Sequence, residues 1–294
     1  MSKLIDFIGN TPLVELTRIN PNSAVKLFAK LEGHNPGGSV KDRAAYGLIK
    51  GALDEGRIHQ GSQLIEATSG NTGIALAMIA QLLGIKIELA MPENSTIERV
   101  MTMRAFGATV KLTPEAGGME SAIDYAKSKV EKEGYVMLDQ FSNPHNPLMH
   151  YQTTGPEIFR DTAGEITHFV SAMGTTGTIM GVSRYLKEQN AAIQIIGAQP
   201  ADGAKIPGIR KWSKEYLPAI FEPNRVDQLI DVSEQEARTM ARRLAKEEGV
   251  FGGMSSGGAV AVALKYMEQL SSGTVVCIIC DRGDKYLSTD LFED

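Results

Sequence analysis

Three segments of the chain combine small and hydroxyl-bearing residues in a way that suits the binding of an anion. They are ATSGNTG at 67–73, MGTTGT at 173–178 and GMSSGGA at 253–259, and we expect each to follow a strand and to precede a helix. A helix N-terminus offers unpaired backbone N–H groups and a positive dipole end, and small residues let an anion approach them. Each turn can therefore hold a phosphate or a carboxylate, although Ser, Thr and Asn are also ordinary helix caps.

The turn from Gly174 to Thr178 suits phosphate best, because the hydroxyls of Thr175, Thr176 and Thr178 add donors to the backbone amides. It contains no lysine, so it is not a Walker A loop. It does not match G-x-G-x-x-G, and the following strand-like segment ends in Gln199, where a dinucleotide enzyme usually has an acid. The pattern predicts a phosphate carried by something smaller than a dinucleotide.

Lys41 lies in HNPGGSVKDR, just after the first clear strand-like run and inside the first turn or two of a helix expected to begin near Ser39. Most lysines are solvated surface charges. A cation in the first turn of a helix is disfavoured by the dipole, and the same field favours the neutral amine that a Schiff base requires. This setting makes Lys41 a candidate for covalent catalysis.

The two cysteines, Cys277 and Cys280, have the C-x-x-C spacing of a redox pair or half a zinc site. The surrounding TVVCIIC is β-branched and apolar, however, and residues three apart on a strand face opposite sides. No HExxH or clustered His and Cys accompanies them, so we expect no metal site. The five histidines show no pairing with a nucleophile, and none is assigned to catalysis.

The elements that position these residues alternate between short apolar runs and longer helical stretches, which is typical of βα units and an α/β fold. Nine strands are many for one sheet. The strand candidates are 25–31, 63–68, 85–91, 108–113, 135–138, 166–173, 192–199, 226–231 and 274–280. The helix candidates are 39–56, 71–83, 95–106, 118–132, 179–189, 233–248 and 256–270.

The turn-rich stretch from Ser142 to Pro147 is the best candidate for a domain junction. We expect a smaller N-terminal α/β domain over residues 1–145, whose first strands can cross to the other domain, and a larger one over 146–294. The longest segment without clear periodicity runs from Gly203 to Pro218, and such a segment is often a lid or binding loop.

Composition restricts the classes of function. The chain has 294 residues, 43% of them hydrophobic, which is enough to fill a substantial core. The net charge of -5, with both signs interspersed, gives no positive stripe for nucleic acid or anionic membranes. The segment 73–91 is interrupted by Gly84, Lys86 and Glu88, so no transmembrane span is expected. The N-terminus lacks the apolar run of a signal peptide, which predicts a cytoplasmic protein.

Taken in order, the motifs resemble those of the O-acetylserine sulfhydrylases (cysteine synthases) of the fold-type II pyridoxal-phosphate enzymes. The resemblance runs from IGNTPL at 8–13 to GDKYLST at 283–289 and includes NPGGSVKDR, EATSGNTG, GTTGT and GMSSGGA. It implies two open, twisted sheets of parallel type flanked by helices, similar to the tryptophan synthase β subunit. It also implies a homodimer, in line with the commonness of two-fold oligomers.

The resemblance implies roles for individual residues. Lys41 would bind pyridoxal 5′-phosphate covalently, Asn71 would bond its 3′-oxygen, and Ser255 would face its pyridine nitrogen. The phosphate would be bound by Gly174, Thr175, Thr176, Gly177 and Thr178, and the substrate carboxylate by Thr68, Ser69, Gly70, Thr72 and Gln140.

The implied reaction is a β-replacement in which the acetyl group of O-acetyl-L-serine gives way to sulfide, through an aminoacrylate intermediate. The lysine amine, once displaced, can act as the base that removes the α-proton. A serine at the pyridine nitrogen cannot stabilise a pyridinium as a carboxylate would, which favours elimination over transamination.

A subtype and several alternatives follow from the same residues. Arg210, Lys211 and Trp212, with Cys280 and Asp281, resemble the B-type isozyme, whose polar groups can admit thiosulfate and give S-sulfocysteine. Arg210 also keeps O-phosphoserine open as a substrate. Threonine dehydratases and cystathionine β-synthases share the lysine, the asparagine and the glycine loops, but they usually carry extra regulatory or haem-binding regions. A catalytically silent scaffold is disfavoured because Lys41 and Ser255 are both present.

Overall fold

The strands of the computed structural model, which describes residues 2–293, divide between two separate sheets. The larger sheet has the order β1-β2-β9-β6-β7-β8, and the smaller has the order β3-β4-β5. The strands are β1 (Leu13–Glu15), β2 (Val25–Leu31), β3 (Gln63–Ala67), β4 (Lys86–Pro92), β5 (Thr109–Thr113), β6 (His168–Ala172), β7 (Gln194–Pro200), β8 (Gln228–Val232) and β9 (Gly273–Ile279). All pairs are parallel except β1 with β2.

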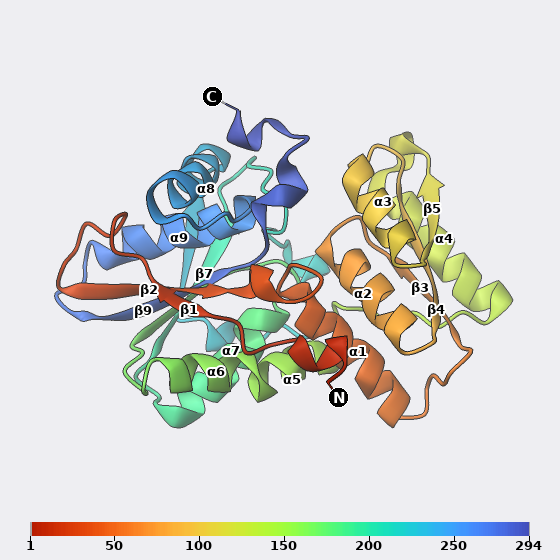
Figure 1. Ribbon diagram of the computed structural model, residues 1–294, viewed down its shortest axis with the longest axis horizontal. Helices are drawn as coiled ribbons and strands as arrows, with labels where there is room; N and C mark the ends of the chain where they lie inside the picture. The colour runs from red at the N-terminus through yellow and green to blue at the C-terminus, as the bar shows by residue number, and fades with distance from the viewer. Residues whose placement is uncertain (1, 294) are drawn as a thin grey trace.

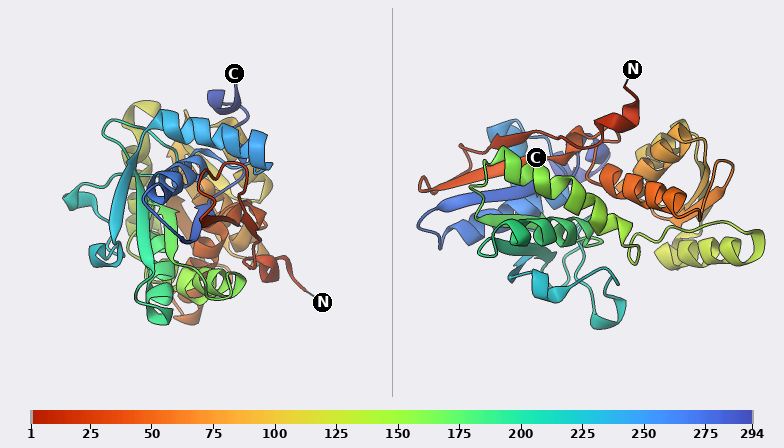
Figure 2. Two further views of the ribbon diagram at one scale, coloured as in Figure 1. Left: turned by 90° about the vertical axis from the view of Figure 1, so that its left-hand side faces the viewer. Right: turned by 90° about the horizontal axis from the view of Figure 1, so that it is seen from below.

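Helices cover both faces of each sheet (Figure 1). They are α1 (Lys41–Asp54), α2 (Asn71–Leu82), α3 (Ile97–Ala105), α4 (Gly118–Glu133), α5 (His145–Gln152), α6 (Thr154–Asp161), α7 (Gly177–Gln189), α8 (Glu234–Glu248) and α9 (Met254–Met267). Helices α8 and α9 pack on one face of the larger sheet, and α6 and α7 pack on the other. Helices α2 and α3 cover one face of the smaller sheet and α4 covers the other, and the view from below shows α2 and α4 on opposite sides (Figure 2).

The central strands are apolar on both sides because both faces are buried. Along β9, Val275, Cys277 and Ile279 enter the core beneath α8 and α9, whereas Val276 and Ile278 enter the core beneath α6 and α7. A third core lies under the smaller sheet, around Leu64, Leu76 and Leu89. No helix among residues 2–293 is long and apolar enough to cross a membrane.

The observed elements confirm the α/β class and most predicted segments, with four exceptions. Residues 135–138 do not form a strand, since only Val136 makes a single bridge, to Leu64. The short strand β1 was not predicted, and neither were α5 and α6. Pro144 and Pro147 suggested a turn, but they occupy the cap and first turn of α5, where a helix needs no backbone donors.

Strands β1 and β2, although they lie in the N-terminal half, belong to the larger sheet. The strands that follow them, β3 to β5, form the smaller sheet. The predicted junction at 142–147 contains the first residues of α5. The domain limits 1–145 and 146–294 stay a proposal, and their outermost residues, 1 and 294, lie outside the described part of the chain.

Candidate active site

The three glycine and hydroxyl turns approach one another where the two sheets meet. The 68–70 turn joins β3 to α2, the 173–176 turn joins β6 to α7, and Gly253 precedes α9. A hydrogen bond from Asn71 Nδ2 to Asp281 Oδ2, 2.7 Å, joins the first residue of α2 to the end of β9. The first two turns follow the carboxyl ends of parallel strands, one in each sheet, which is where α/β proteins bind ligands, and the start of α9 lies beside them.

Lys41 begins α1 and is held at the carboxyl end of β9. Its backbone N–H donates to Ser39 Oγ at 3.2 Å, and the preceding N–H of Val40 donates to the carbonyl of Cys280 at 2.8 Å. Ser39 and Asp281 form an antiparallel bridge. The lysine side chain, half-buried, therefore emerges from a backbone tied to the strand that ends in Cys280 and Asp281.

The first turn brings together the residues predicted to receive a carboxylate. Thr72 Oγ1 donates to Gln140 Oε1 at 2.8 Å, and both side chains are buried. The Thr68 hydroxyl accepts from the N–H of Gly70 at 3.5 Å. The backbone carbonyl of Ser69 accepts from Arg99 Nη1 at 3.4 Å, so this residue is tied to α3.

The second turn has the features of a phosphate cradle. Thr176, which has a φ of 72°, carries a buried hydroxyl without a hydrogen-bond partner among the described residues. A Cβ at Gly174 would lie 2.7 Å from the carbonyl of Gly208, and one at Gly177 would lie 2.0 Å from Asn146 Oδ1. The turn opens the 13-residue helix α7. Small residues, an unpartnered donor and a helix N-terminus together fit a phosphate group.

Two residues behind this turn were not assigned from the sequence. Asn146 Nδ2 donates to Thr175 Oγ1 at 3.2 Å and to the carbonyl of Gln140 at 2.8 Å, which joins the two turns. His150 Nε2 lies 3.3 Å from Thr178 Oγ1. Burial lowers the pKa of His150 to about 3, so a neutral ring supports the turn. Both belong to α5, the helix that was not predicted because of its two prolines.

Ser255 is buried in the first turn of α9, beside Cys280. Burial raises the pKa of the Cys280 thiol to about 11, although a hydrogen bond with Ser255 opposes the shift. Cys277 lies on the opposite face of the sheet, where its thiol contacts the carbonyl of Phe28 at 3.3 Å. Both cysteines are free, and no His, Cys, Asp and Glu cluster suited to a metal occurs within residues 2–293.

The carboxylate of Asp281 is hydrogen-bonded to other side chains of the protein. It is buried, and its Oδ2 accepts from Asn71 Nδ2 and from the Tyr286 hydroxyl, each at 2.7 Å. The structure thus places Asp281, predicted to bind substrate, directly against Asn71, predicted to bind cofactor. Its second oxygen, Oδ1, is buried without a hydrogen-bond partner among the described residues.

The loop from Gly203 to Pro218 covers the second turn. Arg210 donates its backbone N–H to the carbonyl of Met173 at 2.8 Å, and Trp212 Nε1 donates to the carbonyl of Gly174 at the same distance. The Arg210 guanidinium is exposed and lies 5.4 Å from the centre of the Trp212 ring. Lys211 points elsewhere, into ion pairs with Asp202 and Asp231.

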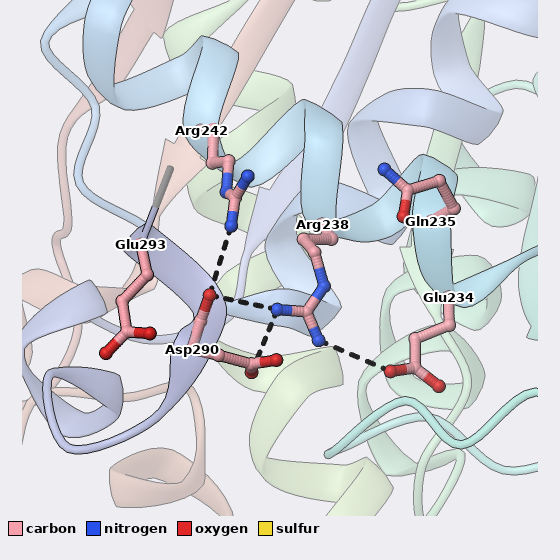
Figure 3. Close-up of a pocket in the computed structure, with 6 residues that line it drawn as sticks. All are labelled: Glu234, Gln235, Arg238, Arg242, Asp290 and Glu293. Carbon is pink, nitrogen blue, oxygen red and sulfur yellow. Dashed lines mark hydrogen bonds and ion pairs between the residues drawn. The ribbon is translucent and has the colours of Figure 1, made fainter.

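Two cavities lie outside these turns. One, of about 550 Å³, is formed by α8 and the C-terminal segment, and Figure 3 shows its arginines turned toward Asp290 and Glu234. Arg238 pairs with both carboxylates, and Arg242 bonds the carbonyl of Asp290. The other, of about 380 Å³, lies between the 33–38 loop, α3 and Lys285.

The chain matches the family model described as pyridoxal-phosphate dependent enzyme over residues 4–281. It is 55% identical to cysteine synthase B of Pseudomonas aeruginosa, covering 99% of this chain and 97% of that protein. It is 54% identical to cysteine synthase B of Escherichia coli, covering 99% and 96%. The crystal structure of a cysteine synthase from Entamoeba histolytica superposes with a TM-score of 0.95 at 37% identity, covering 100% and 91%.

Proposed function

Because the chain belongs to the family of pyridoxal-phosphate dependent enzymes, we propose that it synthesises cysteine by replacing the acetyl group of O-acetyl-L-serine with sulfide. The observation that carries the proposal is the convergence of Lys41, a carboxylate turn, a phosphate turn and Ser255 where the two sheets meet. This arrangement supports a site that holds a phosphorylated cofactor and an amino acid side by side.

Pyridoxal phosphate, when bound, supplies an electron sink for the negative charge that forms when an α-proton is removed. We propose that Lys41 anchors it covalently, that the turn from Gly174 to Thr178 holds its phosphate, and that Asn71 and Ser255 contact its ring. The unpartnered Thr176 hydroxyl and the cradle at Gly174 and Gly177 support the phosphate assignment.

The residues of the first turn bind and orient the substrate. The hydroxyls of Thr68 and Ser69 and the backbone N–H groups of Ser69, Gly70 and Thr72 face the carboxylate, and α2 adds its positive end. The Thr72 hydroxyl donates to Gln140 Oε1, which leaves Gln140 Nε2 as a further donor. With the cofactor bound, Lys41 Nζ would accept the α-proton of the substrate as the general base.

The residues that would face the ring nitrogen of the cofactor carry no negative charge at neutral pH. Ser255 has a neutral hydroxyl, and the pKa of the adjacent Cys280 thiol is about 11. A carboxylate at this place would stabilise a protonated ring. The nearby carboxylate of Asp281 is instead bound to Asn71 and Tyr286. This environment favours loss of the β-substituent over transamination.

The proposal is tested by visible absorbance of the protein supplied with pyridoxal phosphate. We expect a band of the lysine-bound cofactor that is lost when O-acetylserine is added alone and returns when sulfide follows. A band that ignores O-acetylserine but responds to O-phosphoserine would replace the substrate assignment. No band at all would contradict the proposal and favour a silent scaffold.

We also propose that thiosulfate serves as a sulfur donor, because the exposed Arg210 guanidinium lies on the loop that covers the phosphate turn. Arg210→Ala should lower kcat/KM for thiosulfate about tenfold and change that for sulfide little, since a charge-assisted contact contributes about 1.5 kcal/mol. Lys211→Ala is the matched control, because Lys211 is paired with Asp202 and Asp231. Equal losses for both donors would remove Arg210 from donor selection.

We further propose a cytoplasmic homodimer, as the sequence predicts. Light scattering of the purified protein at several concentrations measures the assembly directly, and a monomer at all of them would contradict it.

A further inference from the structure

The ammonium of Lys285 joins segments from both sheets next to the site. Its Nζ donates to the carbonyl of Gly37 at 3.0 Å and to Asn71 Oδ1 at 2.9 Å. Gly37 belongs to the loop that leads to Lys41, Asn71 begins α2 on the smaller sheet, and Lys285 lies in the turn after β9 of the larger sheet. The lysine borders the cavity of about 380 Å³ on its other side.

The backbone makes room for this contact. Gly38 has a φ of 80°, and a Cβ there would lie 3.3 Å from Lys285 Nζ. Burial lowers the pKa of Lys285, but the nearby carboxylates of Asp281 and Asp42 oppose that shift and favour the ammonium. An ammonium has three donors and no acceptor.

The orientation of the Asn71 amide follows from that property. A side-chain amide carries an acceptor on one side and donors on the other, and a flip exchanges them. Only Oδ1 can accept from the Lys285 ammonium, so Nδ2 must face the opposite side, where it donates to Asp281 at 2.7 Å. A flipped amide would set the Nδ2 donors against the Lys285 ammonium and the Oδ1 acceptor against the Asp281 carboxylate. Both contacts would be repulsive.

We propose that Lys285 is a positioning residue, which holds the Asn71 amide with its Nδ2 donors toward the site and fixes α2 against the loop of Lys41. The inference rests on the proposed function, in which Asn71 donates to an oxygen of the cofactor ring. Without Lys285 only the bond to Asp281 orients the amide, so the flipped amide, which presents Oδ1 to that oxygen, becomes more populated and the cofactor should bind more weakly.

The test is a titration of the apoprotein with pyridoxal phosphate, followed by absorbance. Lys285→Met should raise the dissociation constant about tenfold, because the orienting bond involves a charged donor. Asn71→Ala should raise it as well, and adding Lys285→Met to Asn71→Ala should change it little further. Thermal unfolding of each apoprotein checks that it is folded, and Lys285→Gln replaces Lys285→Met if that variant is not.

Two further variants separate positioning from general loss of charge. Lys285→Arg keeps a donor-only group and should restore most of the affinity. Arg282→Met removes another cation that lines the same cavity but pairs with Asp284, and it should leave the dissociation constant unchanged. Hydrogen exchange of the apoprotein should be faster at residues 70–74 in Lys285→Met than in Arg282→Met, a difference that needs no bound cofactor.

An unchanged dissociation constant in Lys285→Met or its glutamine substitute would overturn the inference. So would an equal loss of affinity with and without Asn71, because Lys285 would then act through other groups. Failure of the proposed function looks different, since the unmodified protein would itself give no absorbance band with pyridoxal phosphate.

Discussion

Cysteine synthesis is expected to fall by about 10³-fold or more in Lys41→Ala, because one residue acts as both the covalent anchor and the general base. The protein should stay folded. Alanine retains the backbone N–H that donates to Ser39, and it is a better helix former than lysine. Turnover with O-acetylserine and sulfide, measured beside thermal unfolding of the same preparation, checks both expectations.

Lys50→Ala is the matched control for this experiment. It removes a lysine from the same helix α1, but one that is exposed and paired with Asp54, and turnover should be retained. Undiminished cysteine synthesis by a verified Lys41→Ala variant would show that another residue is the anchor. A variant that loses the cofactor band but keeps its unfolding transition would support the assignment.

The parts of the site that the sequence predicted are those encoded locally. A turn of small and hydroxyl residues between a strand and a helix is recognisable over seven or eight residues, and the position of such a turn at a sheet edge follows from the α/β class. The turns of Thr68 and Thr176 were predicted in this way, whereas the segment of Ser255 follows helix α8 and not the predicted strand. The opposite orientation of Cys277 and Cys280 followed from the two-residue period of a strand.

The parts that were missed depend on contacts between distant segments. Asn146 and His150 lie on α5, a segment that was predicted as a turn because it contains two prolines. Proline is nevertheless acceptable in the first turn of a helix. Lys285 is separated from Asn71 by 214 positions, and nothing in GDKYLST distinguishes it from a surface lysine. Asp281 was recognised, but its partners Asn71 and Tyr286 could only be seen in three dimensions.

The most extensive contact of this kind surrounds Arg43, two residues beyond Lys41. Its guanidinium is fully buried and bonds both carboxylate oxygens of Glu32, at 2.7 and 2.8 Å, and both of Glu157, at 2.7 Å each. Lys30, also fully buried, pairs with Glu157 at 2.9 Å. Burial raises the pKa of Glu32, but Arg43 overcomes this and holds it below its ordinary value. The network ties the first turn of α1 to β2, to the turn that follows it, and to α6.

Arg43→Met should destabilise the protein by about 3–5 kcal/mol, because it leaves the buried carboxylates of Glu32 and Glu157 without their shared partner. Chemical denaturation measures the free energy of unfolding, and Lys50→Met, which breaks an exposed pair on the same helix, should cause no measurable change.

The stability of this network should also depend on pH. Against the opposing effect of burial, Arg43 and Lys30 hold the pKa of Glu157 at about 2, below its ordinary value of 4.5. The contribution of ionised Glu157 to stability is therefore complete above about pH 4.5 and is lost as pH falls toward 2. Arg43→Met should weaken that acid dependence. A variant as stable as the parent at neutral pH would mean that the network does not support α1.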